Sequence, residues 1–228
     1  MTTTGLVPLP PRPPTSPRPE RAPDAYLPMQ QVTEQIAFLP DGWDAERRQK
    51  VRELFDGLAP EWHTRGGPDR VAPTVDALER GGVPAGGVAL EIGSGTGLQT
   101  PPLAERFDYV VSVDLAAAML ALAERRTGVG LVRADASRLP VGPASADVVV
   151  CVNAFLFPDE YARVLRPGGR VVFVSTSGDQ TPIYLAPEKV VAALAPALGG
   201  AHAVTSKCGH GSWTVVARAE HGAPDCPR

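Results

Sequence analysis

The sequence predicts a single α/β domain in which a mostly parallel sheet carries helices on both faces. From residue 88 onward, apolar runs of strand length alternate with helix-forming segments, which is typical of such sheets. The first run ends in an acid, Glu91, and a loop with glycine at every second position follows it. Two later runs also end in an acid, at Asp114 and Asp135. These strand-end acids indicate a ligand site along one edge of the sheet.

Length and composition agree with one enzyme-sized domain. The 228 residues suffice for one substantial core. A net charge of −3 lacks the basic excess typical of proteins that bind nucleic acid or membranes. The longest apolar runs are of strand length, so we expect no membrane insertion. The first residues lack the apolar stretch of a secretion signal, and we therefore expect a cytoplasmic location.

The cysteines and histidines do not predict a metal site. Cys151, Cys208 and Cys226 lie far apart without a Cys-x-x-Cys pair, which favours free thiols. The four histidines lack the spacing of metal ligands. We expect no metal.

The chain divides into four segments. Residues 1–24 hold eight prolines and few apolar side chains, which predicts a disordered tail. Residues 25–86 are expected to form a helical lid, residues 87–220 the ligand-binding domain, and residues 221–228 a flexible end.

Two helices are predicted within the lid segment. Residues 44–59 carry Val51, Leu54, Phe55 and Leu58 at helical spacing, with Asp44 as the capping residue. A second helix is expected over residues 73–80, where a proline occupies the first turn and a glycine pair follows the end.

The sheet is predicted from seven apolar segments. Five strands are expected at residues 88–92, 109–113, 129–133, 146–152 and 170–175, followed by an antiparallel pair at 201–206 and 213–219 with a turn at 208–211. Helices are expected at 115–123 and 186–195. Consecutive prolines predict that the helix after the glycine loop starts late and is short.

The glycine loop resembles motif I of class I S-adenosylmethionine (SAM) methyltransferases. Its pattern is acid-x-Gly-x-Gly-x-Gly from Glu91 to Gly97. A dinucleotide fingerprint needs its third glycine at the position of Leu98, so a nicotinamide cofactor is disfavoured. Further along, Arg166-Pro-Gly-Gly-Arg170 resembles the turn into the fifth strand of the same family.

This resemblance spans residues 44–219 and is nearest to the ubiquinone/menaquinone-type group. It implies a Rossmann-like class I methyltransferase fold with a seven-stranded sheet of order 3-2-1-4-5-7-6. It also implies SAM as the cofactor, with Asp114 on the ribose and Asp135 on the adenine. The implied cofactor-binding residues are Glu91, Gly93, Ser94, Gly95, Gly97, Asp114, Leu115, Asp135, Ala136 and Asn153.

Residues 55–65 are the candidate cover of the site. They resemble the Phe-Asp-x-x-Ala-x-x-aromatic segment of related enzymes, which implies that Trp62 approaches the methionyl end of SAM and that Arg65 pairs with its carboxylate. His63 is a candidate proton acceptor. Candidate residues for the acceptor pocket are Asn153, Phe155, Phe157, Asp179, Thr181 and Tyr184.

The predicted function is in-line methyl transfer from SAM to a small or medium metabolite by a monomer or homodimer. The alternatives are a SAM-binding regulator or partner subunit without turnover, and a nicotinamide-dependent oxidoreductase. Methylation of nucleic acid is disfavoured. Residues 153–156 lack the prolines of an Asn-Pro-Pro-Tyr turn, and Cys151 lies within an apolar run typical of an inert core thiol.

Overall fold

The computed structural model describes residues 5–17, 26–65, 67–200 and 202–219. Its strands are β1 (Gly5–Pro8), β2 (Val88–Ile92), β3 (Tyr109–Asp114), β4 (Val129–Arg133), β5 (Ala146–Val152), β6 (Leu165–Ser175), β7 (His202–Cys208) and β8 (Gly211–Ala217). Its helices are α1 (Leu27–Phe38), α2 (Ala45–Leu58), α3 (Pro68–Arg80), α4 (Thr100–Arg106), α5 (Ala117–Leu122), α6 (Pro158–Val164) and α7 (Pro187–Ala197), with 3₁₀ helices η1 (Ala59–Arg65) and η2 (Gly178–Gln180). None of the helices in the described ranges is long and apolar enough to cross a membrane.

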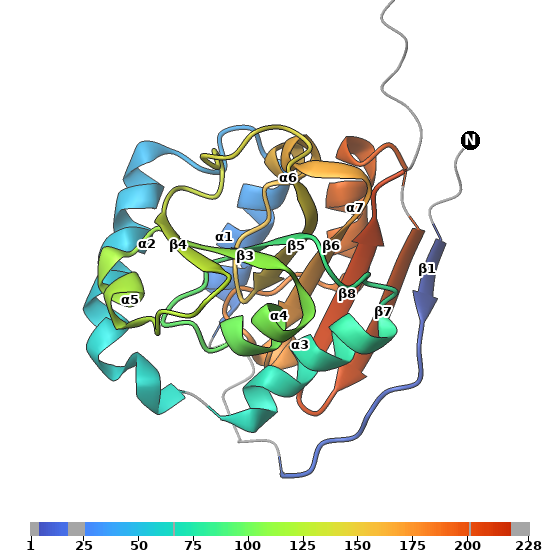
Figure 1. Ribbon diagram of the computed structural model, residues 1–228, viewed down its shortest axis with the longest axis horizontal. Helices are drawn as coiled ribbons and strands as arrows, with labels where there is room; N and C mark the ends of the chain where they lie inside the picture. Colours follow the sequence, from blue (N-terminus) through green and yellow to red (C-terminus); the bar gives the residue numbers. More distant parts are fainter. Residues whose placement is uncertain (1–4, 18–25, 66, 201, 220–228) are drawn as a thin grey trace, which may run out of the picture.

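All eight strands form one sheet with the order β1-β7-β8-β6-β5-β2-β3-β4 (Figure 1). The neighbours from β6 to β4 run parallel, and β8 is antiparallel to both β6 and β7. Without β1, this is the order that the family resemblance implies. The predicted count of seven strands is wrong, because β1 extends the sheet beyond β7.

The N-terminal segment is more ordered than its composition predicts. β1 pairs in parallel with β7, with Gly5 opposite His202. Further along, the Arg12 guanidinium lies 3.0 Å from the carboxylate of Asp76, which is only 1% exposed. The prediction of a disordered tail is therefore wrong for residues 5–12, because β7 and the residues that follow it bond to their backbone groups. The predicted disorder of residues 1–4, 18–24 and 221–228 concerns positions outside the described residues.

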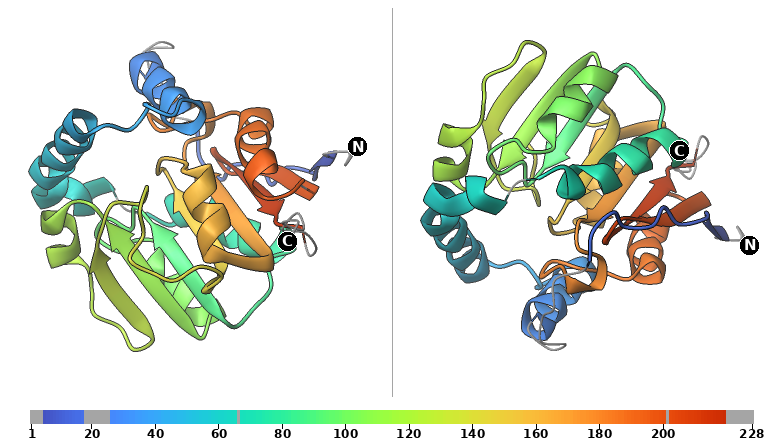
Figure 2. Two further views of the ribbon diagram at one scale, coloured as in Figure 1. Left: turned by 90° about the horizontal axis from the view of Figure 1, so that it is seen from above. Right: turned by 90° about the horizontal axis from the view of Figure 1, so that it is seen from below.

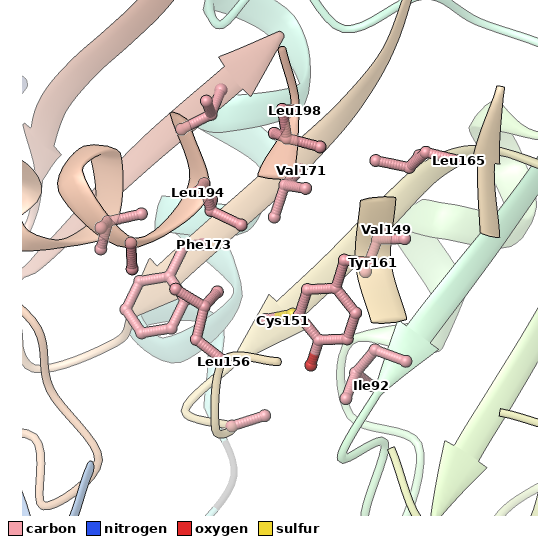
Figure 3. Packing of buried hydrophobic residues seen from close by; sticks show 14 of the residues in the cluster. Ile92, Val149, Cys151, Leu156, Tyr161, Leu165, Val171, Phe173, Leu194 and Leu198 are labelled. Carbon is pink, nitrogen blue, oxygen red and sulfur yellow. The ribbon is translucent and has the colours of Figure 1, made fainter. Parts of the chain in front are cut away.

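Two apolar layers enclose the sheet. Alternate strand residues point to opposite faces: Leu90 joins the layer under α6 and α7, while Ala89 joins the layer under α3 and α4. Figure 3 shows the first layer, in which Cys151 and Tyr161 lie among aliphatic side chains from the strands and from α7. Both layers hold the strands rigid, and the strand ends carry the polar residues.

The helix packed beside β8 and β6 begins earlier than the sequence predicts. α3 starts at Pro68, so Pro73 lies inside the helix and not in its first turn. Pro68 already has the fixed φ that suits a helix start. The buried residues Ala77 and Leu78 of α3 pack on the sheet, and this part of the predicted lid segment therefore belongs to the core.

The remaining N-terminal helices lie to one side of the sheet layers, where Figure 2 shows α1 and α2 in blue. The sequence did not predict α1 as a separate helix. For α2 the predicted cap is confirmed, since the Asp44 carboxylate accepts the Arg47 N–H at 2.7 Å. No residue of α2 is fully buried. Its predicted apolar stripe lines a cavity and does not pack on the sheet.

The helices α4 and α5 are both short. α4 spans seven residues and has a proline at its start, as the consecutive prolines predict. α5 covers only Ala117–Leu122 of the predicted residues 115–123. The strand predictions at 88–92, 129–133 and 146–152 agree with β2, β4 and β5.

Candidate cofactor and acceptor site

A cavity of about 770 Å³ opens at the carboxyl ends of β2 and β5. The strand order reverses between these two strands, and open α/β sheets bind ligands at such a point. Gly93 follows β2 and Asn153 follows β5, and both line the cavity. The other side of the cavity is formed by α1, α2, η1 and the loop after β6.

The backbone N–H groups of the glycine loop bond within the protein. The N–H groups of Gly93 and Ser94 donate to the carbonyl of Val113 at 2.9 and 3.0 Å, and the Gly95 N–H donates to the Asp114 carboxylate at 2.8 Å. A dinucleotide site uses such N–H groups to hold pyrophosphate. Here they bind the loop to the end of β3, so the loop is a poor phosphate cradle.

Glycine is required in this loop for space as well as for φ. Gly93 has φ +67°, and a Cβ there would lie 2.9 Å from the Cβ of Ala154. Gly95 has φ +57°, and its missing Cβ would lie 3.3 Å from Nε1 of Trp62. The loop is therefore packed between the end of β5 and η1.

Glu91 lies behind the loop and not in the cavity. Its Oε2 accepts hydrogen bonds from the hydroxyls of Thr100 and Ser112 at 2.7 and 2.5 Å. Burial raises the pKa of this carboxyl to about 7, although both hydroxyls lower it. Its Oε1 is buried without a hydrogen-bond partner in the structure. Glu91 therefore ties the loop to α4 and β3, and its predicted contact with the cofactor is indirect at most.

Asp114 faces the cavity at the end of β3. Its Oδ1 accepts the Ala116 N–H and its Oδ2 accepts the Gly95 N–H, both at 2.8 Å. Burial raises the pKa of this carboxyl, and the backbone N–H groups oppose that rise. A carboxylate has about four acceptor positions, so Asp114 can also accept a hydrogen bond from a ligand.

Asp135 also lines the cavity, after the end of β4, and it already has partners on the lid side. The indole N–H of Trp43 lies 3.0 and 3.2 Å from its two carboxylate oxygens. The Arg48 guanidinium lies 3.2 Å from Oδ2, and the Ser137 N–H donates to Oδ1 at 2.9 Å. This carboxylate thus joins the sheet edge to the start of α2.

Two polar side-chain atoms near the loop are buried without a hydrogen-bond partner. They are Oγ of Ser94 and Oε1 of Gln99, and both residues line the cavity. Unpaired buried polar atoms are costly. A polar ligand with donors, such as the amino-acid end of SAM, fits these positions.

Residues 90–173 match the family described as "Methyltransferase domain". Together with the glycine loop, the strand-end acids and the sheet order, this match shows which family the chain resembles. The chain is similar to the class I SAM-dependent methyltransferases.

Curated proteins and solved structures show the same similarity. The chain is 28% identical over 154 residues to a demethylmenaquinone methyltransferase of Paenarthrobacter aurescens, a stretch covering 61% of this chain and 60% of that protein. In this and two other curated relatives, the matched stretch covers between 21% and 60% of the relative's own length.

Two solved structures share the fold. The methyltransferase complexed with the Trm112 methyltransferase activator of Haloferax volcanii has a TM-score of 0.60 at 18% identity, covering 72% of this chain and 97% of that one. A DhpI–SAM–HEP complex has a TM-score of 0.58 at 21% identity, covering 72% and 94%.

Most of the predicted cofactor residues surround the cavity. The lining includes Trp62, Gly93, Ser94, Gly95, Asp114, Leu115, Asp135, Ala136 and Asn153. Glu91 and Gly97 are not part of the lining. The side chains of His63 and Arg65 lie outside the described residues, so their roles stay predictions.

The predicted acceptor residues divide into two groups. Phe155, Phe157 and Thr181 line the cavity, whereas Asp179 and Tyr184 are not part of its lining. Asn153 has φ +51°. Its side chain donates to the Thr176 hydroxyl and accepts the Thr176 N–H, both at 2.9 Å. Asn153 therefore fixes the ends of β5 and β6 together, and its amide has these partners already.

Cys151 lies in the core, as predicted. It is fully buried, and burial raises the pKa of its thiol to about 12. A thiol of this kind carries almost no thiolate at neutral pH and is a poor nucleophile.

The sequence predicted no role for Trp43, Arg48 or Asp56. Trp43 and Arg48 bind Asp135, and the Asp56 carboxylate accepts the Ala118 N–H at 2.9 Å. The only indication in the sequence of a role for Asp56 was its place in the Phe-Asp segment that resembles related enzymes. For Trp43 and Arg48 no sequence pattern exists, because their partner is about 90 residues away.

Proposed function

We propose that this protein transfers the methyl group of SAM to a small or medium-sized metabolite. The observation that carries this proposal is the division of the cavity. Strand-end carboxylates and unpaired polar atoms lie near the glycine loop, while aromatic and aliphatic side chains from the lid and from the loops after β5 and β6 form the opposite side. Such a site suits a polar cofactor beside a less polar acceptor.

In this proposal, each end of SAM has a matching set of residues. The Asp114 carboxylate suits the ribose hydroxyls. Asp135 and Ala136 suit the adenine, and Ser94 and Gln99 suit the amino-acid end. Trp62, beside Gly95, suits the space near the sulfur.

The chain contributes alignment and exclusion of water more than acid–base chemistry. When bound, SAM supplies a methyl group already activated by its sulfonium. The lid residues Leu58 and Trp62 and the sheet residue Val152 line the cavity, and they keep water from the reacting atoms. The acceptor pocket would hold the nucleophile on the far side of the methyl carbon from the sulfur.

The glycine loop argues against a nicotinamide cofactor, since its N–H groups already have partners. A SAM-binding regulator without turnover has the same cofactor site, and only turnover separates it from an enzyme. Because the chain is similar to demethylmenaquinone methyltransferases, hydroxylated naphthalenes are the first acceptor class to test.

The test measures cofactor binding and turnover separately. Calorimetry with SAM, S-adenosylhomocysteine (SAH) and NAD measures which of these cofactors binds. Release of SAH in the presence of 1,4-dihydroxynaphthalene and a panel of aliphatic alcohols and amines gives turnover. Binding of SAM with acceptor-dependent release of SAH supports the proposal. Tight NAD binding without SAM binding would overturn it, and SAM binding without turnover on any acceptor would favour the regulator.

A further inference from the structure

The side chain of Trp43 contacts residues at both ends of the cavity. Its indole N–H donates to Asp135 on the sheet side. Its rings lie 5.5 Å from those of Phe155 and Phe157, centroid to centroid, at 50° and 65°. These tilted and edge-on geometries are favourable for aromatic pairs. One residue thus links the predicted adenine end of the site to the acceptor end.

The turn that carries Trp43 is packed tightly against α1. A Cβ on Gly42 would lie 2.2 Å from the carbonyl oxygen of Gln35. The Arg47 guanidinium donates to the Gly42 carbonyl and to the side chain of Gln35. Because the turn is held from both sides, the fold fixes the backbone of Trp43, while the hydrogen bond to Asp135 orients its indole ring.

The surroundings of Trp43 toward the lid are apolar. It belongs to a cluster with Phe155, Phe157, Ile183 and Met29, which we call the lid cluster, and all five residues line the cavity. The charged side chains among the described cavity residues are Arg70, Asp114 and Asp135, and none of these three belongs to the lid cluster. A charged acceptor would lose its hydration here without compensation.

Resting on the proposed function, we propose that Trp43 is a positioning residue that couples the two ligands. The indole ring of Trp43 forms one wall of the pocket for a flat, uncharged acceptor. The indole N–H donates to Asp135, and this hydrogen bond makes the affinity for the acceptor depend on the cofactor. A cofactor that donates to Asp135 orders the carboxylate that orients the indole. The acceptor then binds against an indole ring that is already oriented. By thermodynamic linkage, the acceptor raises the affinity for the cofactor by the same factor.

The experiment measures acceptor affinity with and without cofactor. Calorimetry uses 2-naphthol as a flat neutral probe and 2-naphthoate as its charged counterpart, each alone and with saturating SAH. We expect 2-naphthol to bind at least about tenfold more tightly than 2-naphthoate, and SAH to raise its affinity about fivefold or more. Intrinsic fluorescence and melting curves check that each variant is folded.

Three variants separate the roles of the Trp43 ring, its N–H and the neighbouring donor Arg48. Trp43→Phe keeps an aromatic ring, so 2-naphthol should still bind in the absence of SAH. Because the N–H is lost, SAH should no longer raise the affinity for 2-naphthol. Arg48→Met removes the other lid donor to Asp135 without touching the lid cluster, and it should keep most of the gain caused by SAH. Trp43→Ala should weaken naphthol binding at least about tenfold.

Equal coupling in Trp43→Phe and the unaltered protein would overturn the proposal, and so would equal affinity for naphthol and naphthoate. Failure of SAH to bind would instead count against the proposed function. In that case the comparison of naphthol with naphthoate, made without cofactor, still decides whether Trp43 forms the acceptor wall.

Discussion

Three carboxylates at neighbouring strand ends have three different environments. Glu91 is sealed behind the glycine loop, Asp114 lies in the cavity with two backbone partners, and Asp135 is bound by the lid. The sequence places all three at strand ends but cannot separate their roles, since each role depends on residues far away in the chain. Ser112 and Trp43, for example, decide two of them.

Asp114 is expected to contribute most to cofactor affinity. Asp114→Ala should weaken SAH binding by about 1.5–3 kcal/mol, because a charged acceptor of two hydroxyl donors is lost. This corresponds to a rise in Kd of roughly 10- to 100-fold. Calorimetry measures it, with Asp159→Ala on the exposed surface of α6 as the control. Unchanged affinity in a folded variant would move the ribose contact elsewhere.

Glu91 should make stability depend on pH. Its pKa is raised from 4.5 to about 7 in the folded protein, so between these values the folded state holds more protons than the unfolded state. The contribution of the protonated carboxyl is present at pH 4 and is lost as the pH rises through 7. Between pH 5 and pH 8, the free energy of unfolding of Glu91→Gln should rise relative to the unaltered protein by up to about 3 kcal/mol.

Urea unfolding at several pH values tests this dependence. The exposed Glu105 of α4 supplies the matched control, since Glu105→Gln should show no such trend. Parallel pH profiles for Glu91→Gln and the unaltered protein would mean that Glu91 stays ionised in the folded state.

At the scale of elements, the helix α5 lacks a capping side chain of its own, because Ala116 occupies its N-cap. Asp56 of α2 supplies the missing acceptor to Ala118. Asp56→Ala should cost about 1 kcal/mol, a usual value for a lost cap, and should weaken SAH binding because α2 loses its hold on the body. Glu53→Ala, on the exposed side of α2, should change neither melting temperature nor affinity.

β1 is expected to stabilise the whole sheet. Deleting residues 1–12 removes the strand paired with β7 and the Arg12 partner of buried Asp76. A loss of about 2 kcal/mol lowers the Tm of a chain of this size by roughly 4–8 °C. Deleting residues 1–4 alone should leave Tm unchanged. Equal Tm for both deletions would restore the interpretation of a tail without structural role.

Elements with local signals are predictable from this sequence, and elements defined by distant partners are not. β2, β4 and β5 agree with their predicted bounds because each is a continuous apolar run between turn residues. β1 is short and is followed by several prolines. Its strand conformation depends on its pairing with β7, which lies almost 200 residues further along the chain. The start of α3 was misplaced because Pro68 and Pro73 are equally good first-turn residues by sequence.

For the whole molecule, cofactor binding should stabilise the fold by mass action. SAH at about 100 times its Kd should add about 2.7 kcal/mol to the free energy of unfolding, whereas NAD at the same concentration should add nothing. Thermal melting with each ligand measures the difference, with Asp114→Ala as the control that should lose the effect of SAH. A larger shift with NAD than with SAH would contradict the proposed cofactor.

The pairing of β1 with β7 also orders events during synthesis on the ribosome. Leu9 lies 197 residues from Ser206, to which it is hydrogen bonded, so the N-terminal strand emerges long before its partner exists. Contacts of such separation form late, and the exposed edge of a nascent sheet is prone to wrong pairing. β1 can therefore join the edge of the sheet only after β7 has been translated, so it stays unpaired while the strands between them are made.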